Sequence, residues 1–309
     1  MAEQRRLPVP EGLIGERLDI ALSRMLGLSR SAAVALIDEG RVRVDDRPVA
    51  KSERLLGDQW IDVEIPDRDI AREPEPVEGM RIVFDDDDLV IVDKPVGVAA
   101  HPSPGWTGPT VIGGLAAAGY RISTSGAAER QGVVHRLDVG TTGLMAVAKS
   151  EPAYSSLKDQ FRERTVEKVY RAIAQGHLDP LAGTIDAPID RHPTQEWRMA
   201  VVSGGRPSIT HYQTLEAFPR ASLLEIHLET GRTHQIRAHL AALRHPLVGD
   251  TTYGADPTLA GRLGLSRPAL HAARLAVDPP ATGERLVVES PDPPDLTEAL
   301  RRLEAAAEG

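Results

Sequence analysis

Residues 132–150 read GVVHRLDVGTTGLMAVAKS, a stretch in which a polar group separates two apolar segments. Two valines at 133–134 precede the polar group, and the run LMAVA at 144–148 follows it. Short apolar runs bounded by glycines are typical of buried strands. A surface loop would explain the polar residues but not these flanks. The stretch therefore places a lone carboxylate, Asp138, between two segments that we expect to be buried.

The composition is that of an ordinary globular chain. The 309 residues are 41% hydrophobic and 26% charged, and the length favours one large domain plus a smaller one. The chain has no cysteine, which excludes disulfides, iron–sulfur clusters, thiolate catalysis and cysteine-based zinc sites. The start MAEQRRLPVPEG lacks the apolar core of a signal peptide, and no later stretch approaches a membrane span. We therefore expect a cytoplasmic protein.

The charge distribution is more informative than the net charge of −9, which by itself argues against a nucleic-acid partner. Residues 64–88 carry ten acids against three basic residues, whereas residues 191–244 carry seven arginines against four acids. Solvated faces of both signs would give the same counts. If RNA is a partner, we expect it to meet a localised face.

Residues 13–66 are predicted to form a small domain that begins with two helices. Apolar residues recur at helical spacing over residues 18–26, and Gly27 is expected to end that helix. Ser29 is a good N-cap for a second helix, and Gly40 is a good stop for it.

The rest of the small domain is predicted to be a short sheet. Residues 42–44 and 61–65 alternate between apolar and polar side chains, as strands do. We expect residues 1–12 to be an N-terminal tail. We expect residues 67–79, which are rich in proline and charge, to be a linker.

Residues 80–309 are predicted to form one large domain of the α+β class. Short β-runs with hairpin-like spacing alternate with few helices, which favours a mixed, mainly antiparallel sheet. Helices are expected at residues 151–164 and 233–244, with a closing helix at residues 295–307.

Several common functional motifs are absent from the sequence. It contains no GxxxxGK(S/T) loop, no GxGxxG turn and no GxSxG elbow, so nucleotide cofactors and the commonest serine-hydrolase site have no visible signature. A metal-dependent hydrolase is the natural rival, because eight of the ten histidines follow Tyr170. His234 and His239 are five residues apart, so they would not share one helix face as a ligand pair. We expect neither a metal nor a cofactor.

Three separated segments remain: HRLDVGTTG around Asp138, VEKVYRAIAQG around Tyr170 and LETGRTHQIRAHL around Arg237. Together they resemble the RluA/RluD-type pseudouridine synthases, which isomerise selected uridines in structured RNA. The similarity runs from about Arg81 to Glu289 and includes DKPVGVAAHPSPG, HPLVGDTTYG and LHAARL. Each piece is weak alone, but their joint occurrence in family order is specific. The resemblance implies the pseudouridine synthase fold for the large domain.

The amino-terminal domain resembles a known RNA-binding module. The stretch SRMLGLSRSAAVALIDEGRVRVDDRPV is similar to the module named after small-subunit ribosomal protein four. In that module the second helix and its loop face RNA. The resemblance offers four arginines to phosphates, although each of them could equally serve solubility: Arg24, Arg30, Arg41 and Arg43.

The resemblance also assigns the catalytic residues. Asp138 is implied to be essential, either as nucleophile or as the base that takes a proton from the ribose. Arg237 is implied to pair with it, because a planar cation favours and orients a carboxylate in an apolar pocket. Tyr170 is implied to stack on the extruded uracil, and assistance of proton loss at C5 is a second role that the resemblance offers it. Taken singly, Asp138 could merely open a turn, Arg237 could lie on an exposed helix face, and Tyr170 could be strand packing.

Other residues have secondary roles in this interpretation. Arg136 resembles the residue that enters the position vacated by the uridine, and Lys94 is a candidate phosphate or active-site contact. We expect His135 to be structural. Gly140 and Gly143 are expected to let the backbone turn tightly behind the aspartate.

The sequence thus predicts an RNA pseudouridine synthase that flips its target base out of the helix, with large-subunit ribosomal RNA as the expected substrate. A non-catalytic RNA-binding or ribosome-assembly protein on the same fold is the alternative, and a metal hydrolase ranks third. A monomer is favoured.

Overall fold

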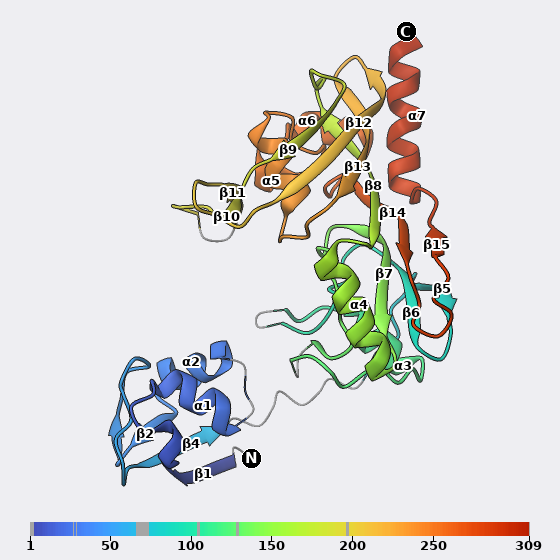
Figure 1. The fold of residues 1–309 in the computed structure, drawn as a ribbon. Coiled ribbons are helices and arrows are strands. Elements are labelled where there is room, and N and C mark those ends of the chain that lie inside the picture. The colour runs from blue at the N-terminus through green and yellow to red at the C-terminus, as the bar shows by residue number, and fades with distance from the viewer. Residues whose placement is uncertain are drawn as a thin grey trace. The chain divides into compact units, whose positions relative to one another are not determined.

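The computed structural model describes residues 3–26, 28, 30–65, 74–103, 106–127, 130–195 and 198–308. The chain forms two compact units that divide between Glu75 and Pro76 (Figure 1). The second unit comprises Pro76–Gly126 and Arg130–Gly309. Each unit has its own hydrophobic core.

The small unit packs two helices on an antiparallel sheet with the strand order β1-β4-β2-β3. Leu18 and Leu22 of α1 are completely buried against Ile61 and Val63 of β4. The elements are β1 (Glu3–Pro8), η1 (Glu11–Leu13), α1 (Leu18–Leu26), α2 (Arg30–Asp38), β2 (Val42–Val44), β3 (Arg47–Pro48) and β4 (Trp60–Ile65).

The N-terminal segment differs from our expectation of a tail over residues 1–12. Strand β1 pairs with β4 along its whole length, from Glu3 opposite Ile65 to Pro8 opposite Trp60. Proline is tolerated here because β1 is an edge strand and Pro8 is its last residue. Gly40 follows α2 with φ +72° and ends it as predicted. The expected roles of Gly27 and Ser29 fall on residues outside the described ones.

The expected linker over residues 67–79 is also too long. Its residues 67–73 lie outside the described part of the chain. Val77 already packs against the core of the large unit. A Cβ added at Gly114 would lie 2.7 Å from Val77, so the two segments are in close contact. The large unit therefore begins before Val77.

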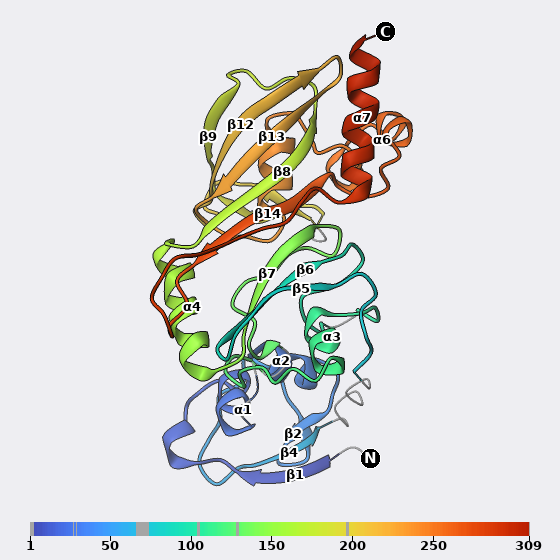
Figure 2. The ribbon, with the colours of Figure 1, turned by 90° about the vertical axis from the view of Figure 1, so that its right-hand side faces the viewer.

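The large unit is built on a nine-stranded sheet with the order β5-β6-β7-β14-β8-β13-β12-β9, and β15 pairs with β14 (Figure 2). Among the described strands only the β7–β14 pair is parallel. The α+β class with a mainly antiparallel mixed sheet is confirmed. The strands are β5 (Arg81–Asp85), β6 (Leu89–Lys94), β7 (Thr142–Ala148), β8 (Glu167–Gln175), β9 (Ala182–Asp186), β12 (Ile209–Phe218), β13 (Ala221–Leu228), β14 (Leu270–Val277) and β15 (Leu286–Glu289).

Helices and one separate hairpin complete this unit. The helices expected at 151–164, 233–244 and 295–307 are present, and each end lies within two residues of the expected position. They are α4 (Glu151–Glu163), α5 (Gln235–Ala242) and α7 (Pro294–Glu308), and the others are α3 (Val111–Ala117), η3 (Thr251–Tyr253) and α6 (Pro257–Leu263). Strands β10 (Ile189–Arg191) and β11 (Met199–Val201) form the hairpin.

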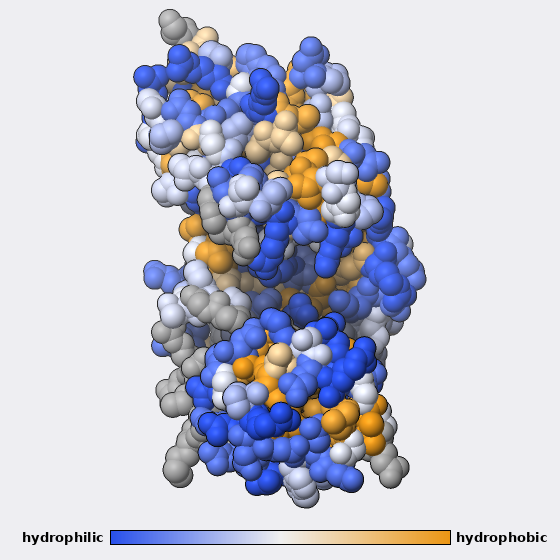
Figure 3. Space-filling model, turned by 90° about the vertical axis from the view of Figure 1, so that its left-hand side faces the viewer, coloured by the Kyte–Doolittle hydropathy of each residue, from blue (hydrophilic) through white to orange (hydrophobic). Residues whose placement is uncertain are grey.

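The core lies on both faces of the large sheet. Every residue of β7 is buried, with alternate side chains in two different clusters. The face drawn in Figure 3 is mostly hydrophilic, with hydrophobic residues in scattered patches.

Within the described residues, no helix combines the length and the apolar character needed to cross a membrane.

Candidate active site

Asp138 lies in the turn that leads into β7, and 20% of its side chain is exposed. Its backbone carbonyl accepts a hydrogen bond from Thr141 N at 3.0 Å. Gly143 has φ +110° and pairs with Ala272 of β14, where a Cβ would lie 2.3 Å from the Ala272 carbonyl oxygen. The valines at 133–134 are buried as predicted. The turn thus holds a carboxylate at the start of β7, which is an interior strand of a tightly packed sheet.

Arg237 approaches Asp138 from helix α5. Its Nη1 lies 3.6 Å from Asp138 Oδ2, and the arginine is buried rather than on an exposed helix face. The same guanidinium makes a two-pronged contact with Asp250, with Nε–Oδ2 at 2.6 Å and Nη2–Oδ1 at 2.9 Å. Asp250 is completely buried and was not among the residues that the sequence singled out. It fixes the plane of the guanidinium that faces Asp138.

His234 and Tyr253 complete the surroundings of Asp138. His234 Nε2 lies 3.9 Å from Asp138 Oδ2, and its Nδ1 lies 3.1 Å from the Tyr253 hydroxyl. The Arg237 guanidinium lies over the Tyr253 ring, 4.9 Å from its centroid. His234 has φ +53°, a left-handed conformation that is uncommon for a non-glycine residue. Burial lowers the pKa of His234, and the charge of Asp138 partly opposes that effect.

Tyr170 lies on β8 and is buried in the main hydrophobic cluster. Burial, and secondly the negative charge of Asp138, raise the pKa of its phenol far above the usual value. The phenol therefore keeps its proton at neutral pH. This favours stacking or hydrogen-bond donation by Tyr170 over a role as a base.

Lys94 does not fit the phosphate contact that we expected. It is completely buried at the end of β6, and its Nζ donates to the carbonyls of Val98 at 2.8 Å and Pro95 at 3.1 Å. The Val139 carbonyl lies 3.5 Å away. Burial lowers the pKa of Lys94 to about 7, opposed by the charge of Asp138. Lys94 therefore supports the backbone beside Asp138.

His135 and Arg136, which lie three and two residues before Asp138, have different environments. Arg136 is exposed. His135 Nε2 accepts a hydrogen bond from Ala146 N at 2.9 Å, and its ring stacks on Phe161 with centroids 4.7 Å apart. Burial lowers the pKa of His135 to about 3, so this ring is neutral. Its contacts are structural, as expected.

The four arginines predicted to bind RNA lie in the small unit, and three of them have acidic neighbours. Arg30 pairs with the buried Asp19 at 2.9 Å. Arg41 pairs with Glu64 at 2.7 Å, and Arg24 lies 3.9 Å from Glu16. Arg43 is an exposed residue of β2. All four arginines are at least partly exposed.

Nothing in the described part of the chain supports a metal centre. No group of three or more histidine or acidic residues there could hold a metal ion. Both ring nitrogens of His239 are already engaged, Nδ1 with Thr210 Oγ1 at 2.8 Å and Nε2 with the Ala187 carbonyl at 2.9 Å.

Comparison with known families assigns both units. The RNA pseudouridylate synthase family matches residues 88–242, and the S4 domain family matches residues 16–61. Two solved human structures share the fold. RNA Pseudouridylate Synthase Domain Containing 1 is 30% identical with a TM-score of 0.58, covering 77% of this chain and 98% of that one. Domain Containing 4 is 26% identical with a TM-score of 0.57, covering 72% and 92%.

The sequence similarity to several relatives covers nearly the whole chain. A Mycobacterium bovis protein named as an uncharacterized RNA pseudouridine synthase is 59% identical, over 97% of this chain and 98% of its own length. The ribosomal large subunit pseudouridine synthase D of Neisseria meningitidis is 42% identical, over 97% and 82%. The Escherichia coli protein of the same name is 37% identical, over 96% and 93%.

Proposed function

The chain belongs to the RNA pseudouridine synthase family, and we propose that it converts uridines of large-subunit ribosomal RNA into pseudouridine with Asp138 as the essential residue. The observation that carries the role of Asp138 is its position 3.6 Å from the buried guanidinium of Arg237. The substrate class is supported by the relatives named ribosomal large subunit pseudouridine synthase D, at 42% and 37% identity.

The reaction is an isomerisation that neither adds nor removes atoms. The N1–C1′ glycosidic bond breaks, the uracil rotates, C1′ joins C5, and the C5 proton moves to N1. Asp138 acts either as the nucleophile at C1′ or as the base that takes a ribose proton, and in both cases its carboxylate is restored at the end. Arg237, held by Asp250, orients that carboxylate toward the bound nucleotide.

The target uridine must leave its helix, because its ribose and base cannot be reached inside a stack. The partly exposed carboxylate of Asp138 is accessible to such an extruded nucleotide. Tyr170 offers a ring for stacking, which contributes about 1–3 kcal/mol per base in single-strand binders. The exposed Arg136 would fill the gap left in the RNA helix.

In this proposal the S4 domain adds affinity through its basic residues. Arg24, Arg30, Arg41 and Arg43 contact phosphates, and for Arg24 and Arg41 the phosphates replace part of the interaction with Glu16 and Glu64. The carboxylate partner of Arg30 is buried, so it holds the arginine in place before RNA arrives.

The direct test is to incubate unmodified large-subunit ribosomal RNA and, separately, unmodified transfer RNA with the wild-type protein and with Asp138→Asn. Binding is measured for each RNA, and pseudouridine is then mapped. We expect product with the wild type and none with the variant. Asp159→Asn is the matched control, because Asp159 is an exposed residue of α4.

Equal product from Asp138→Asn and the wild type would show that the role of Asp138 is wrong. Product in transfer RNA but not in large-subunit ribosomal RNA would show that the substrate class is wrong. A wild type that binds ribosomal RNA without modifying any RNA would favour the non-catalytic assembly role.

A further inference from the structure

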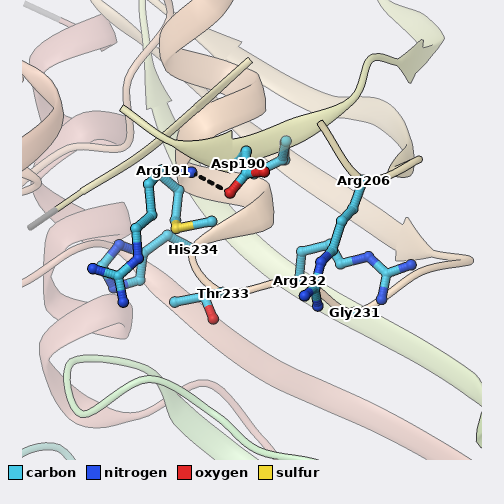
Figure 4. A pocket seen from close by; sticks show the side chains of 9 residues that line it. Asp190, Arg191, Arg206, Gly231, Arg232, Thr233 and His234 are labelled. Atoms are coloured by element: carbon cyan, nitrogen blue, oxygen red, sulfur yellow. Dashed lines mark hydrogen bonds between the residues drawn. The ribbon is translucent and has the colours of Figure 1, made fainter. Parts of the chain in front are cut away.

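A pocket of about 410 Å³ lies beside the active site, within the large unit (Figure 4). Three chain segments line it: the β10–β11 hairpin, the turn before β12, and residues 231–234 before α5. Each segment contributes one arginine, namely Arg191, Arg206 and Arg232. Figure 4 draws Arg206 and Arg232 at one side of the pocket and Arg191 and His234 at the other. A volume of this size has room for a small ligand rather than a single water.

The described pocket lining carries three arginines against one carboxylate, so its net charge is positive. Among the described residues, none of them has an ion-pair partner, and Nε of Arg232 is buried without a hydrogen bond. The one carboxylate of the pocket, Asp190, accepts a hydrogen bond from the backbone N of Arg191 at 2.7 Å. Three unpaired arginines around one hollow repel one another, so an anion bound there would relieve that repulsion.

The backbone holds the two arginines at one side of the pocket in place. Arg206 exchanges two backbone hydrogen bonds of 2.9 Å with Ile189 of β10. A Cβ on Gly205 would lie 2.8 Å from the Ile189 carbonyl carbon, so only glycine allows this close approach. Arg232 N donates to the Gln235 side chain at 3.0 Å, and that buried glutamine also donates to Ile209 O at 3.0 Å. The pocket is therefore largely formed before a ligand arrives.

His234 belongs to both sites. It lines the pocket, and its Nε2 lies 3.9 Å from Asp138 Oδ2. The His234 side chain would thus lie between a ligand in the pocket and the nucleotide that reacts at Asp138. The position suits the part of an RNA strand that is next to the extruded uridine.

We propose that this pocket binds a phosphodiester of the RNA strand flanking the target uridine, through Arg191, Arg206 and Arg232. The inference rests on the proposed function and assigns a second anchoring point for the same substrate. Arginine is suited to this role because its planar fork matches phosphate oxygens with two parallel hydrogen bonds. Anchoring the strand here would hold the uridine against Asp138 in one orientation.

The test measures the affinity for large-subunit ribosomal RNA transcribed in vitro, over a range of salt concentrations, for the full-length wild type, Arg206→Gln and Arg232→Gln. We expect each variant to bind about tenfold more weakly, as for a lost charge-assisted hydrogen bond. The plot of log affinity against log salt should become shallower by about one unit per arginine. Arg232→Lys, which keeps the charge, should lose affinity while keeping the wild-type slope.

Arg262→Gln is the matched control, because Arg262 is exposed on α6 outside the pocket and should leave affinity, slope and pseudouridine yield unchanged. Thermal unfolding of each variant shows whether it is folded, and Arg191→Gln, which removes the third arginine of the pocket, replaces a glutamine variant that is not. Weaker binding with an unchanged slope for both glutamine variants would overturn the phosphate assignment. Wild-type affinity and slope in both would overturn the pocket as an RNA site.

This outcome is separate from that of the proposed function. The binding measurement is informative whether or not product forms, because it follows counterion release and not chemistry. Absence of pseudouridine with the wild type contradicts the proposed substrate, whereas unaltered binding by the arginine variants contradicts only the pocket.

Discussion

Arg237 interacts with two carboxylates, which differ in their distance from the guanidinium and in their burial. Asp250 holds the guanidinium through two short hydrogen bonds, whereas Asp138 lies 3.6 Å away and is partly exposed. The stronger contact is therefore with the residue that the substrate does not reach. We interpret Asp250 as a positioning residue that acts through Arg237.

We predict that Asp250→Asn lowers the rate of pseudouridine formation by about tenfold to a hundredfold, as expected when a charge-assisted hydrogen bond of about 1.5–3 kcal/mol is weakened. RNA affinity should stay at the wild-type value, because Asp250 is buried behind the arginine. Single-turnover rates at saturating enzyme, together with a binding titration, check both parts. A loss of affinity with an unchanged rate would contradict the positioning role.

We also predict a pH dependence of stability in the small unit, centred on Asp19. The hydrogen bond from Arg17, with a further one from Arg30, lowers the pKa of this carboxyl to about 2 from the usual 3.8. The folded form thus binds fewer protons, so the stabilisation is complete above pH 3.8 and is lost as the pH falls through 2. Asp19→Asn should lose about 1–3 kcal/mol at neutral pH.

Thermal unfolding at pH 7 and at about pH 2 measures this effect. The difference between the wild type and Asp19→Asn should shrink at the lower pH. Asp38→Asn is the control, because its ion pair with Lys51 is exposed at both ends. A difference that stays constant with pH would mean that Asp19 does not carry the effect.

Sequence patterns predicted part of this site and missed the rest for a physical reason. Asp138 and Arg237 were expected to pair, and the structure places them within ion-pair distance. His234 lies only three residues before Arg237, so its closeness follows from the local chain. Asp250 and Tyr253 also lie around the pair, but nothing in the spacing of those two residues indicates a shared location. Their contacts depend on how the turn after α5 folds back, which is a property of tertiary packing.

At the scale of elements, the parallel contact of β7 with β14 sets the position of the turn that carries Asp138. Gly143 makes that contact, and its positive φ and the nearby Ala272 backbone both require glycine. Gly140 has less need to be glycine, because a Cβ there would meet only the Pro268 ring at 3.3 Å.

We predict that Gly143→Ala destabilises the large unit by more than about 3 kcal/mol, since it combines backbone strain with a clash in the centre of the sheet. Gly140→Ala, the matched control, should cost much less. Chemical denaturation of both variants gives the comparison. Similar losses in the two variants would show that the strand contact does not depend on Gly143.

Element ends were predicted less well than element types, and β1 shows why. Its residues include Pro8 and alternate poorly, so they are typical of an irregular tail. The strand forms because β4 offers an unpaired edge, and that partner is more than fifty residues away in sequence. In contrast, the helix ending before Gly40 was predicted from a local signal, and the structure confirms it.

At the scale of the whole molecule, each unit has a hydrophobic core of its own. Leu18, Leu22 and Ile61 belong to a core that contains no residue of the large sheet. The chain as a whole has a net charge of −9. The arginines of the pocket and of the small unit are local concentrations of positive charge on this acidic protein. RNA affinity should therefore be a sum of separate basic surfaces.

We predict that deleting residues 1–75 leaves the large unit folded, whereas deleting residues 1–79 destabilises it by about 1 kcal/mol, because Val77 then no longer packs on its core. Val77→Ala in the full chain should lower stability in the same direction. Both deletions should weaken RNA binding and make its salt dependence shallower, since the S4 domain arginines are lost. Thermal unfolding and salt titrations measure these effects. If the shorter deletion fails to fold, or binds RNA as the full chain does, the two units are not independent in the way their separate cores indicate.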